Sequence, residues 1–387
     1  MKHLSIKLSW LLIGVFGLSE CITPFTPSGI STLGGTLVVD GDIILNDQTE
    51  IILSYSWPLD DYQDDAYIIN AMVWVEDEQG GKYDGIIDAL SKTPPRYVVQ
   101  TNGLDPTLHY KLCILLSDGR RYESPMLQAL IAPPIDSIGF EVNAEKTSVE
   151  FYVNTLGNLS DSRFYKWRYK EDWEFTSAYQ PEYYYSSRTR TIERYLADPY
   201  LYYCWSQSES TAILIGKTDH LDNNVVYQKK LNLITQRDSR INYLYSMELT
   251  QMSISKEAYT FWSVLEKNTN QMGGIFAPQP SEMAGNIRCV SNPEEHVLGY
   301  ISVGLPSKKR VFVSARDINI YQSSCVEIDP RNFEPMLDAF DLFDSGCLIT
   351  QVIDQQSRLA LWASDFCVDC RLRGTKNRPL FWPNDHQ

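Results

Sequence analysis

The chain reads Leu104-Asp105-Pro106-Thr107-Leu108-His109-Tyr110 over residues 104–110, and apolar Leu112, Ile114 and Leu116 follow at every second position. A period of two is typical of a strand that buries one of its faces. The run ends at Asp118-Gly119, a pair that favours a turn. This stretch therefore predicts a half-buried β-strand that begins after a proline-containing corner.

Further short strands flank this stretch. Runs rich in Val, Ile and aromatic residues occupy Leu37–Gly41, Ile51–Tyr55 and Ala71–Glu76, and Gln79-Gly80-Gly81 after the last of them favours a hairpin. The Leu-x-Pro-x-x-x-Tyr pattern resembles the start of the sixth strand in fibronectin type III modules, where the tyrosine hydroxyl bonds back to the main chain. We expect an immunoglobulin/fibronectin III-like sandwich over residues 36–132.

A second β-sandwich with a short helix is predicted for residues 133–320. Paired prolines at 133–134 mark the boundary, because proline cannot continue a sheet interior. The expected strands cover Ile138–Val142, Ser148–Thr155, Phe164–Tyr169 and Arg240–Leu249, and a hairpin is expected from Val297–Val303 and Arg310–Ser314. Ser255 can cap a helix over 256–267 whose buried stripe would be Ala258, Phe261, Trp262 and Leu265.

The second sandwich carries an insert unusually rich in aromatic residues, from Trp167 to Trp205. Alternate residues of a strand face opposite sides, so the triplet Tyr183-Tyr184-Tyr185 must turn a ring outward unless another element covers it. We expect a binding face that includes Trp173, Tyr183, Tyr184 and Tyr185. The alternative, with equal weight, is a packed aromatic insert.

The N-terminus predicts export. Lys2 and Lys7 precede the apolar run Leu8–Leu18, which is long enough for a signal peptide and too short to span a bilayer. Residues 1–20 would be removed, Cys21 would be acylated, and residues 21–35 would form a lipidated tether. Glu20 departs from the small residue usual at that position, so an ordinary secretory signal or an uncleaved anchor is the alternative.

Export places the cysteines in an oxidising compartment, where disulfides are expected. Cys113 lies in a predicted strand, and we expect it to be buried and free. The six disulfide candidates are Cys204, Cys289, Cys325, Cys347, Cys367 and Cys370.

The first expected pair is Cys204 with Cys289, and the second and third would bridge Cys325 and Cys347 to the Cys367/Cys370 segment. Cys367-Val368-Asp369-Cys370 could instead be a redox pair or half of a zinc site, but no strand–helix context or second close cysteine pair accompanies it. Residues 321–387 would then be a disulfide-stapled region, with a short helix over Phe333–Phe343, packed on the second domain.

The net charge and the sequence motifs make several classes of function less favoured. The formal net charge of -15 disfavours nucleic acid as a partner, and attachment to a membrane would rest on lipid alone. Beyond the signal, His109, His220, His296 and His386 stand in no zinc-protease motif, and we predict no catalytic residues and no cofactor. Asp60, Asp61, Asp64 and Asp65 could ligate calcium, although an acidic solvated loop is favoured.

A series of short motifs resembles, in order over the full chain, the Bacteroidota outer-membrane lipoprotein family catalogued as domain of unknown function 4249. The motifs are Cys21-Ile22-Thr23-Pro24-Phe25, Leu37-Val38-Val39-Asp40-Gly41, Asp118-Gly119, Tyr169-Lys170-Glu171-Asp172-Trp173-Glu174-Phe175, Cys204-Trp205, Tyr259-x-Phe261-Trp262, Gly285-Asn286-Ile287, Val297-Leu298-Gly299-Tyr300, Cys367-Val368-Asp369-Cys370 and Pro379-Leu380-Phe381-Trp382. The resemblance implies lipoproteins of the outer membrane, often encoded beside TonB-dependent receptors, without an established enzymatic activity.

We therefore predict a non-catalytic outer-membrane lipoprotein that serves as an accessory or ligand-capturing partner of a TonB-dependent transporter. Two alternatives stay open: a surface hydrolase of peptide or glycan, and an adhesin-like structural protein. Paired carboxylates in a pocket, or a serine beside His109, His220 or His296, would favour the hydrolase. A broad exposed Tyr/Trp face would favour binding.

Overall fold

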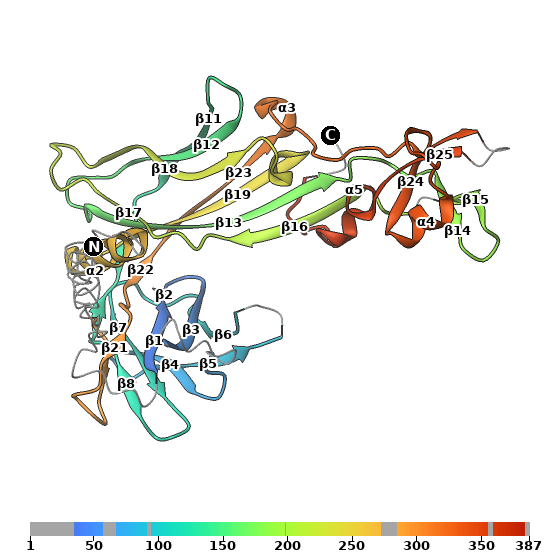
Figure 1. Cartoon of the computed structure of the whole chain (residues 1–387). Coiled ribbons are helices and arrows are strands. Elements are labelled where there is room, and N and C mark those ends of the chain that lie inside the picture. The colour runs from blue at the N-terminus through green and yellow to red at the C-terminus, as the bar shows by residue number, and fades with distance from the viewer. Residues whose placement is uncertain are drawn as a thin grey trace, which may run out of the picture.

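The computed structural model describes residues 35–56, 67–90, 94–197, 199–271, 285–354 and 359–383. It is mainly β, as predicted, with several sheets and few helices. Figure 1 shows a first sandwich, a second sandwich whose long strands β13 and β16 extend away from it, and a small lobe at the far end of those strands.

The first sandwich is built from ten short strands that follow the predicted alternation. They are β1 (Thr36–Gly41), β2 (Ile43–Ile44), β3 (Gln48–Ser56), β4 (Met72–Asp77), β5 (Lys82–Asp88), β6 (Arg96–Gln100), β7 (His109–Leu115), β8 (Arg121–Glu123), β9 (Leu127–Gln128) and β10 (Leu130–Ile131). β4 and β5 form the predicted hairpin. The hydroxyl of buried Tyr110 donates to the Asp105 carbonyl at 2.8 Å, which confirms the tyrosine corner.

A later segment of the chain returns to complete this sandwich. β20 (Arg288–Cys289) pairs with β8, and β21 (Val297–Leu298) runs parallel to β1. Ile287, Cys289 and Ile301 are buried in the first core. The prediction that residues 133–320 all belong to the second domain therefore needs correction, because strand periodicity does not reveal which sheet a strand will join.

The hairpin predicted around residue 306 is wrong for the same reason. β22 (Val303–Leu305) pairs with β2 and β10, whereas β23 (Ser307–Ser314) pairs with β19 in the second sandwich. The chain crosses between the two sandwiches at Pro306, so the two strands on either side of it diverge.

The second sandwich packs two sheets around an aromatic core. Its elements are β11 (Ile135–Val142), β12 (Ser148–Leu156), β13 (Phe164–Thr176), β16 (Tyr203–Glu209), β17 (Leu214–Lys217), β18 (Val225–Thr235), η1 (Ser239–Ile241), β19 (Leu244–Ser253), α2 (Lys256–Gln271), β23 and α3 (Ala315–Ile318). One sheet has the order β11-β12-β18, and the other has the order β16-β13-β19-β23. Phe151, Trp167 and Tyr245 are fully buried between them.

Helix α2 confirms the predicted capping and buried stripe. The Ser255 hydroxyl accepts a hydrogen bond from the Ala258 amide at 3.1 Å. Ala258, Phe261 and Trp262 are buried and Leu265 is partly buried against them. The helix ends at Gln271, a turn later than expected. No described helix is long and apolar enough to cross a membrane.

A buried ion pair joins the two sandwiches. Lys166 of β13 donates to the Asp42 carboxylate at 2.7 Å, and both side chains are almost fully buried. The ammonium also lies 3.8 Å from the centre of the Trp262 ring, a cation–π contact. Burial lowers the pKa of Lys166, against the opposing charge of Asp42.

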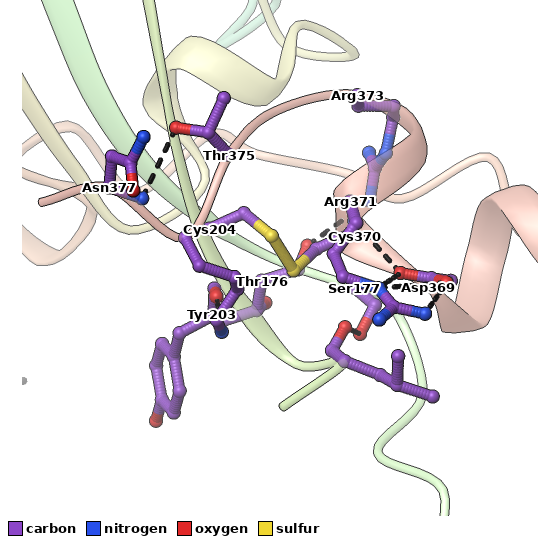
Figure 2. Close-up of a disulfide and its surroundings, with 12 residues drawn as sticks. Thr176, Ser177, Tyr203, Cys204, Asp369, Cys370, Arg371, Arg373, Thr375 and Asn377 are labelled. Atoms are coloured by element: carbon purple, nitrogen blue, oxygen red, sulfur yellow. Dashed lines mark hydrogen bonds and ion pairs between the residues drawn. A yellow bond between two sulfur atoms is a disulfide. The ribbon is translucent and has the colours of Figure 1, made fainter. Parts of the chain in front are cut away.

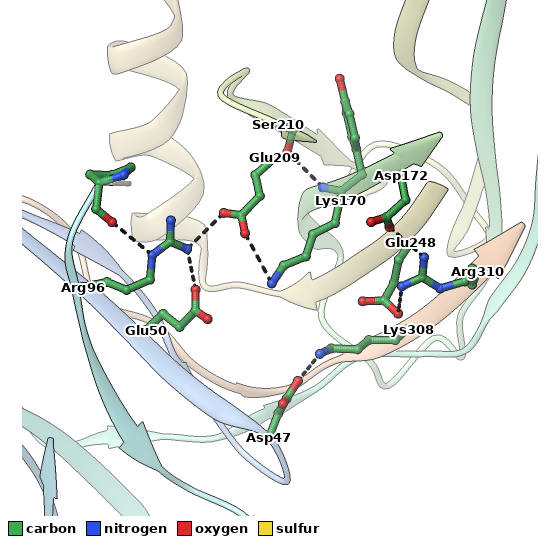
Figure 3. Close-up of polar contacts among 12 residues, drawn as sticks. Asp47, Glu50, Arg96, Lys170, Asp172, Glu209, Ser210, Glu248, Lys308 and Arg310 are labelled. Carbon is green, nitrogen blue, oxygen red and sulfur yellow. Dashed lines mark hydrogen bonds and ion pairs between the residues drawn. The ribbon is translucent and has the colours of Figure 1, made fainter. Parts of the chain in front are cut away.

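More exposed ion pairs surround this junction (Figure 3). Arg96 of β6 bonds Glu50 at 2.7 Å within the first sandwich and Glu209 of β16 at 3.0 Å across the junction. Lys308 of β23 bonds Asp47 of the first sandwich. Each sandwich thus contributes both cationic and anionic side chains to these ion pairs, which hold the two sandwiches in one orientation.

Candidate binding surface on the distal lobe

The distal lobe is the small unit at the end of β13 and β16 farthest from the first sandwich (Figure 1). Its elements are β14 (Tyr183–Ser186), β15 (Thr191–Arg194), η2 (Pro330–Asn332), α4 (Ala339–Asp344), β24 (Cys347–Asp354), β25 (Leu359–Ser364), α5 (Asp365–Val368) and η3 (Cys370–Leu372). Two hairpins form it, β14 with β15 and β24 with β25. It therefore joins part of the aromatic insert to the cysteine-rich C-terminal region.

The helix predicted over residues 333–343 is shorter in the structure. Only Ala339–Asp344 is α-helical, and Asp338 caps it by accepting from the Phe340 amide at 2.7 Å. Pro335 explains the late start, because proline inside a helix removes a hydrogen bond and clashes with the preceding turn. The segment before α4 is irregular and crosses the surface of the lobe.

A small aromatic core holds the lobe together. Tyr185 is buried with its ring centre 5.4 Å from that of Phe343 and 6.0 Å from that of Trp362. Leu342 and Ile349 are buried in the same cluster. Helix α4 is thus anchored by two of its side chains, which leaves its opposite side facing away from this core.

Two disulfides staple the lobe to its surroundings. Cys204 at the start of β16 bonds Cys370 of η3, as Figure 2 shows. Cys325, in the segment before η2, bonds Cys367 of α5. The Trp205 amide also donates to the Thr375 carbonyl at 2.8 Å, so that hydrogen bonds continue the first bridge. These bridges substitute for a large core, which a unit of this size cannot build.

The disulfide pattern confirms part of the sequence prediction and corrects the rest. Cys113 is free and buried, as expected, and Cys367 is bridged to Cys325. The proposed Cys204–Cys289 pair is wrong, because Cys289 is buried in the first sandwich while Cys204 lies at the base of the distal lobe. Cys347 is also free, buried in the lobe core.

The side chains of the predicted aromatic face are largely buried. Tyr185 belongs to the lobe core, and Trp173 and Tyr183 are partly buried against neighbouring clusters. The reason is that α4, β24 and β25 cover this side of the β14–β15 hairpin, which the spacing of tyrosines could not reveal. Tyr184 is half-buried; its hydroxyl donates to Glu193 at 2.6 Å, and this hydrogen bond raises the pKa of Tyr184.

The exposed apolar side chains of the lobe are different ones. Phe333, Met336 and Phe340 are 45%, 62% and 38% exposed, on α4 and the segment that leads to it. We call these three residues the apical patch. The guanidinium of Arg190, in the β14–β15 turn, lies 5.4 Å from the Phe340 ring and flanks the patch with positive charge. Sequence reasoning missed the patch because it treated residues 333–343 as one short helix and did not ask which of its side chains would reach solvent.

Other exposed apolar residues occur elsewhere on the lobe and on the segment after it. They are Leu196, Tyr200, Val326, Ile353, Phe366, Leu372, Leu380 and Phe381. Monomeric proteins seldom expose many large apolar side chains in one region without a binding role. The lobe is therefore the candidate interaction surface.

The remaining sequence candidates lie apart from this lobe. Among the described residues, His109 contacts Glu78 at 2.8 Å in the first sandwich and His220 lies beside Asp219 at 3.5 Å in the second. Within the same residues, no group of three His, Cys, Asp or Glu side chains is placed to hold a metal ion. The signal, Cys21, most of the tether, the aspartates of residues 60–65 and His386 lie outside the described residues.

The family resemblance rests on a direct comparison. The model of the family described as "Domain of unknown function (DUF4249)" matches residues 22–310, well over half of the chain. The match spans the first sandwich and continues through β14 and β15 into β23. A comparison with curated proteins found no match. The chain therefore belongs to the DUF4249 family.

Proposed function

We propose that this protein is a non-catalytic, lipid-anchored outer-membrane protein that acts as an accessory or ligand-capturing partner of a TonB-dependent transporter. The distal lobe is its contact with the transporter. The observation that carries the proposal is the apical patch: three large apolar side chains exposed within eight consecutive residues of a lobe that two disulfides staple in place.

The chemistry of the patch suits a protein partner. Interface centres are rich in aromatic residues, methionine and arginine, and a few such residues supply most of the binding energy. Phe333, Met336, Phe340 and the neighbouring Arg190 are of these types. The support of Phe340 is rigid, since Leu342 anchors α4 in the lobe core, so little conformational entropy of this helix would be lost on binding.

The position of the patch also suits a tethered protein. The proposed lipid on Cys21 would connect through residues 21–35 to β1, in the first sandwich. The distal lobe lies at the other end of the molecule (Figure 1). Tethering both proteins to one membrane raises their effective concentration, so a patch of modest area and affinity would suffice.

The test is co-purification of the transporter from detergent-solubilised outer membranes with the tagged full-length protein. Met336→Ser combined with Phe340→Ser should reduce recovery of the transporter strongly, because truncating central interface residues typically costs about 2 kcal/mol or more. The control is Tyr227→Ser with Leu233→Ser on β18, which are 75% and 55% exposed on the second sandwich. Equal recovery with both double variants would refute the proposed contact.

The anchor is tested separately. Cys21→Ala should move the protein from the membrane fraction to the soluble fraction, and mass spectrometry of the wild-type N-terminus should find an acylated Cys21. A wild-type N-terminus at any other residue would refute lipid anchoring. It would leave the distal lobe contact to be judged by the co-purification result alone.

A further inference from the structure

The first sandwich has an open hollow of about 250 Å³ that no part of the proposed contact uses. It lies between the segment that starts at Tyr67 and the β7–β8 turn at Ser117 and Asp118. The main chain of Tyr67 forms a bridge with Ser54 of β3, which fixes the aromatic wall to the sheet.

The floor of the hollow is apolar and rigid. Ile68 and Leu116 line it, and both are buried members of the first hydrophobic core. The Tyr97 hydroxyl donates to the Ile68 carbonyl at 3.2 Å and accepts from the Ala71 amide at 2.9 Å. The wall above carries Tyr67, which is 46% exposed, and Tyr55. Aromatic side chains thus stand beside a floor that cannot rearrange easily.

The rim of the hollow is polar and preorganised. Asp118 accepts from the Arg120 side chain at 2.7 Å and from its amide at 3.0 Å, and these bonds lower the pKa of the carboxyl group. Arg120 in turn bonds Glu295 at 2.9 Å and the Tyr55 hydroxyl at 3.2 Å. The Asn70 amide donates to the Ser117 hydroxyl at 3.3 Å.

These contacts decide the charge of a suitable ligand. Arg120 is already neutralised by two carboxylates, so it offers little to an anion, and the chain as a whole carries a net charge of -15. Asp118 is paired with Arg120, so it attracts a cation only weakly. The lining therefore suits a neutral molecule with several hydroxyl groups and one apolar face.

We infer that this hollow binds a single neutral pyranose unit of a glycan. The C–H face of the sugar ring would lie on Tyr67, and its hydroxyls would donate to Asp118 and exchange hydrogen bonds with Asn70 and Ser117. The hollow of about 250 Å³ has room for one six-membered ring and its hydroxyls. This inference deepens the ligand-capturing part of the proposed function.

The test uses the full-length protein in a detergent without sugar headgroups and no transporter. Saturation-transfer NMR is recorded with methyl pyranosides of glucose, galactose, mannose and N-acetylglucosamine, each at millimolar concentration. At least one should bind, and Tyr67→Ala should weaken that binding about tenfold, the worth of one aromatic contact. Tyr227→Ala, at a 75% exposed tyrosine of β18, should leave the affinity unchanged.

Two results would overturn the inference: no saturation transfer from any pyranoside, or equal affinity in wild type and Tyr67→Ala. If Tyr67→Ala fails to fold, Asn70→Ala at the exposed rim decides instead, with the same expected loss. Because the transporter is absent, failure here leaves the distal lobe contact untouched. Loss of transporter capture in the apical-patch variant would likewise leave sugar binding untouched.

Discussion

Replacing Asp42 with asparagine removes the carboxylate that compensates Lys166 in the junction between the two sandwiches. Both side chains are about 5% exposed, and the ion pair is 2.7 Å long. Without the charge of Asp42 the buried ammonium keeps the amide oxygen of the introduced asparagine, the ring of Trp262 at 3.8 Å and the attraction of Asp40. Breaking a buried pair from one side typically costs about 3–5 kcal/mol, and we expect the free energy of unfolding to fall by that amount.

The reciprocal change and the double change separate attraction from desolvation. Lys166→Met keeps most of the apolar stem but leaves Asp42 buried with the Ser302 amide, 3.3 Å away, as its one remaining hydrogen-bond donor among the described residues. It should also cost about 3 kcal/mol or more. The double variant has no unpaired charge, so it should lose less than the sum of the single losses, with a coupling of about 2 kcal/mol or more.

The assay is urea unfolding of the four proteins, followed by tryptophan fluorescence. Lys230→Met is the control: it removes an ion pair of nearly equal length, 2.8 Å to Glu150, but Lys230 is 75% exposed. It should change stability by less than about 1 kcal/mol. If Asp42→Asn costs no more than Lys230→Met, or if the Asp42 and Lys166 changes are additive, the ion pair is not the junction's main polar contact.

Exchanging Cys325 or Cys367 for alanine opens a bridge with a sequence separation of 42 residues, and chain entropy gives a loss of roughly 4 kcal/mol. The urea midpoint of the distal lobe should fall, and an unchanged midpoint would argue against the bridge. Tyr110→Phe should cost about 1–2 kcal/mol in urea unfolding, since it leaves the Asp105 carbonyl without its buried donor; a neutral effect would show that water replaces the hydroxyl. Burial raises the pKa of Glu209, but the hydrogen bond from Arg96 and the positive charges of Lys170 and Arg96 together lower it by more, so the net pKa is lowered. The stability that Glu209 contributes is thus present above its unfolded pKa of about 4.3 and is lost as pH falls through the folded pKa. Glu209→Gln should lose less stability than wild type on acidification, as measured by melting temperature against pH; parallel curves would contradict this.

Local patterns predicted much of the fold. Alternation over residues 112–116, the Tyr110 corner and the Ser255 cap each depend on neighbours within a few residues, and each is present in the structure. Such features are determined by short-range sterics and hydrogen bonding, which the sequence shows directly.

Long-range pairing was not predictable in this way. The sequence around Cys289 and Val297 is compatible with a strand in either sandwich. In the structure both residues complete the first sandwich, although the second sandwich lies between them and the rest of it in the sequence. The pairing of Cys204 with Cys370 likewise depends on where β16 begins in space. The polar rim around Arg120 combines residues separated by up to 175 positions, so no local sequence motif predicts it.

By itself, the sequence determined the β class, the positions of most strands, the capped helix and membership of the DUF4249 family, because these follow from residue order over short spans. Only the tertiary structure decided which tyrosines are core and which apolar side chains reach solvent. Tyr185 is buried because α4, β24 and β25 close over it, whereas Met336 is exposed because nothing in the described chain covers it. Burial is a property of the packed elements together, and a single segment does not contain it.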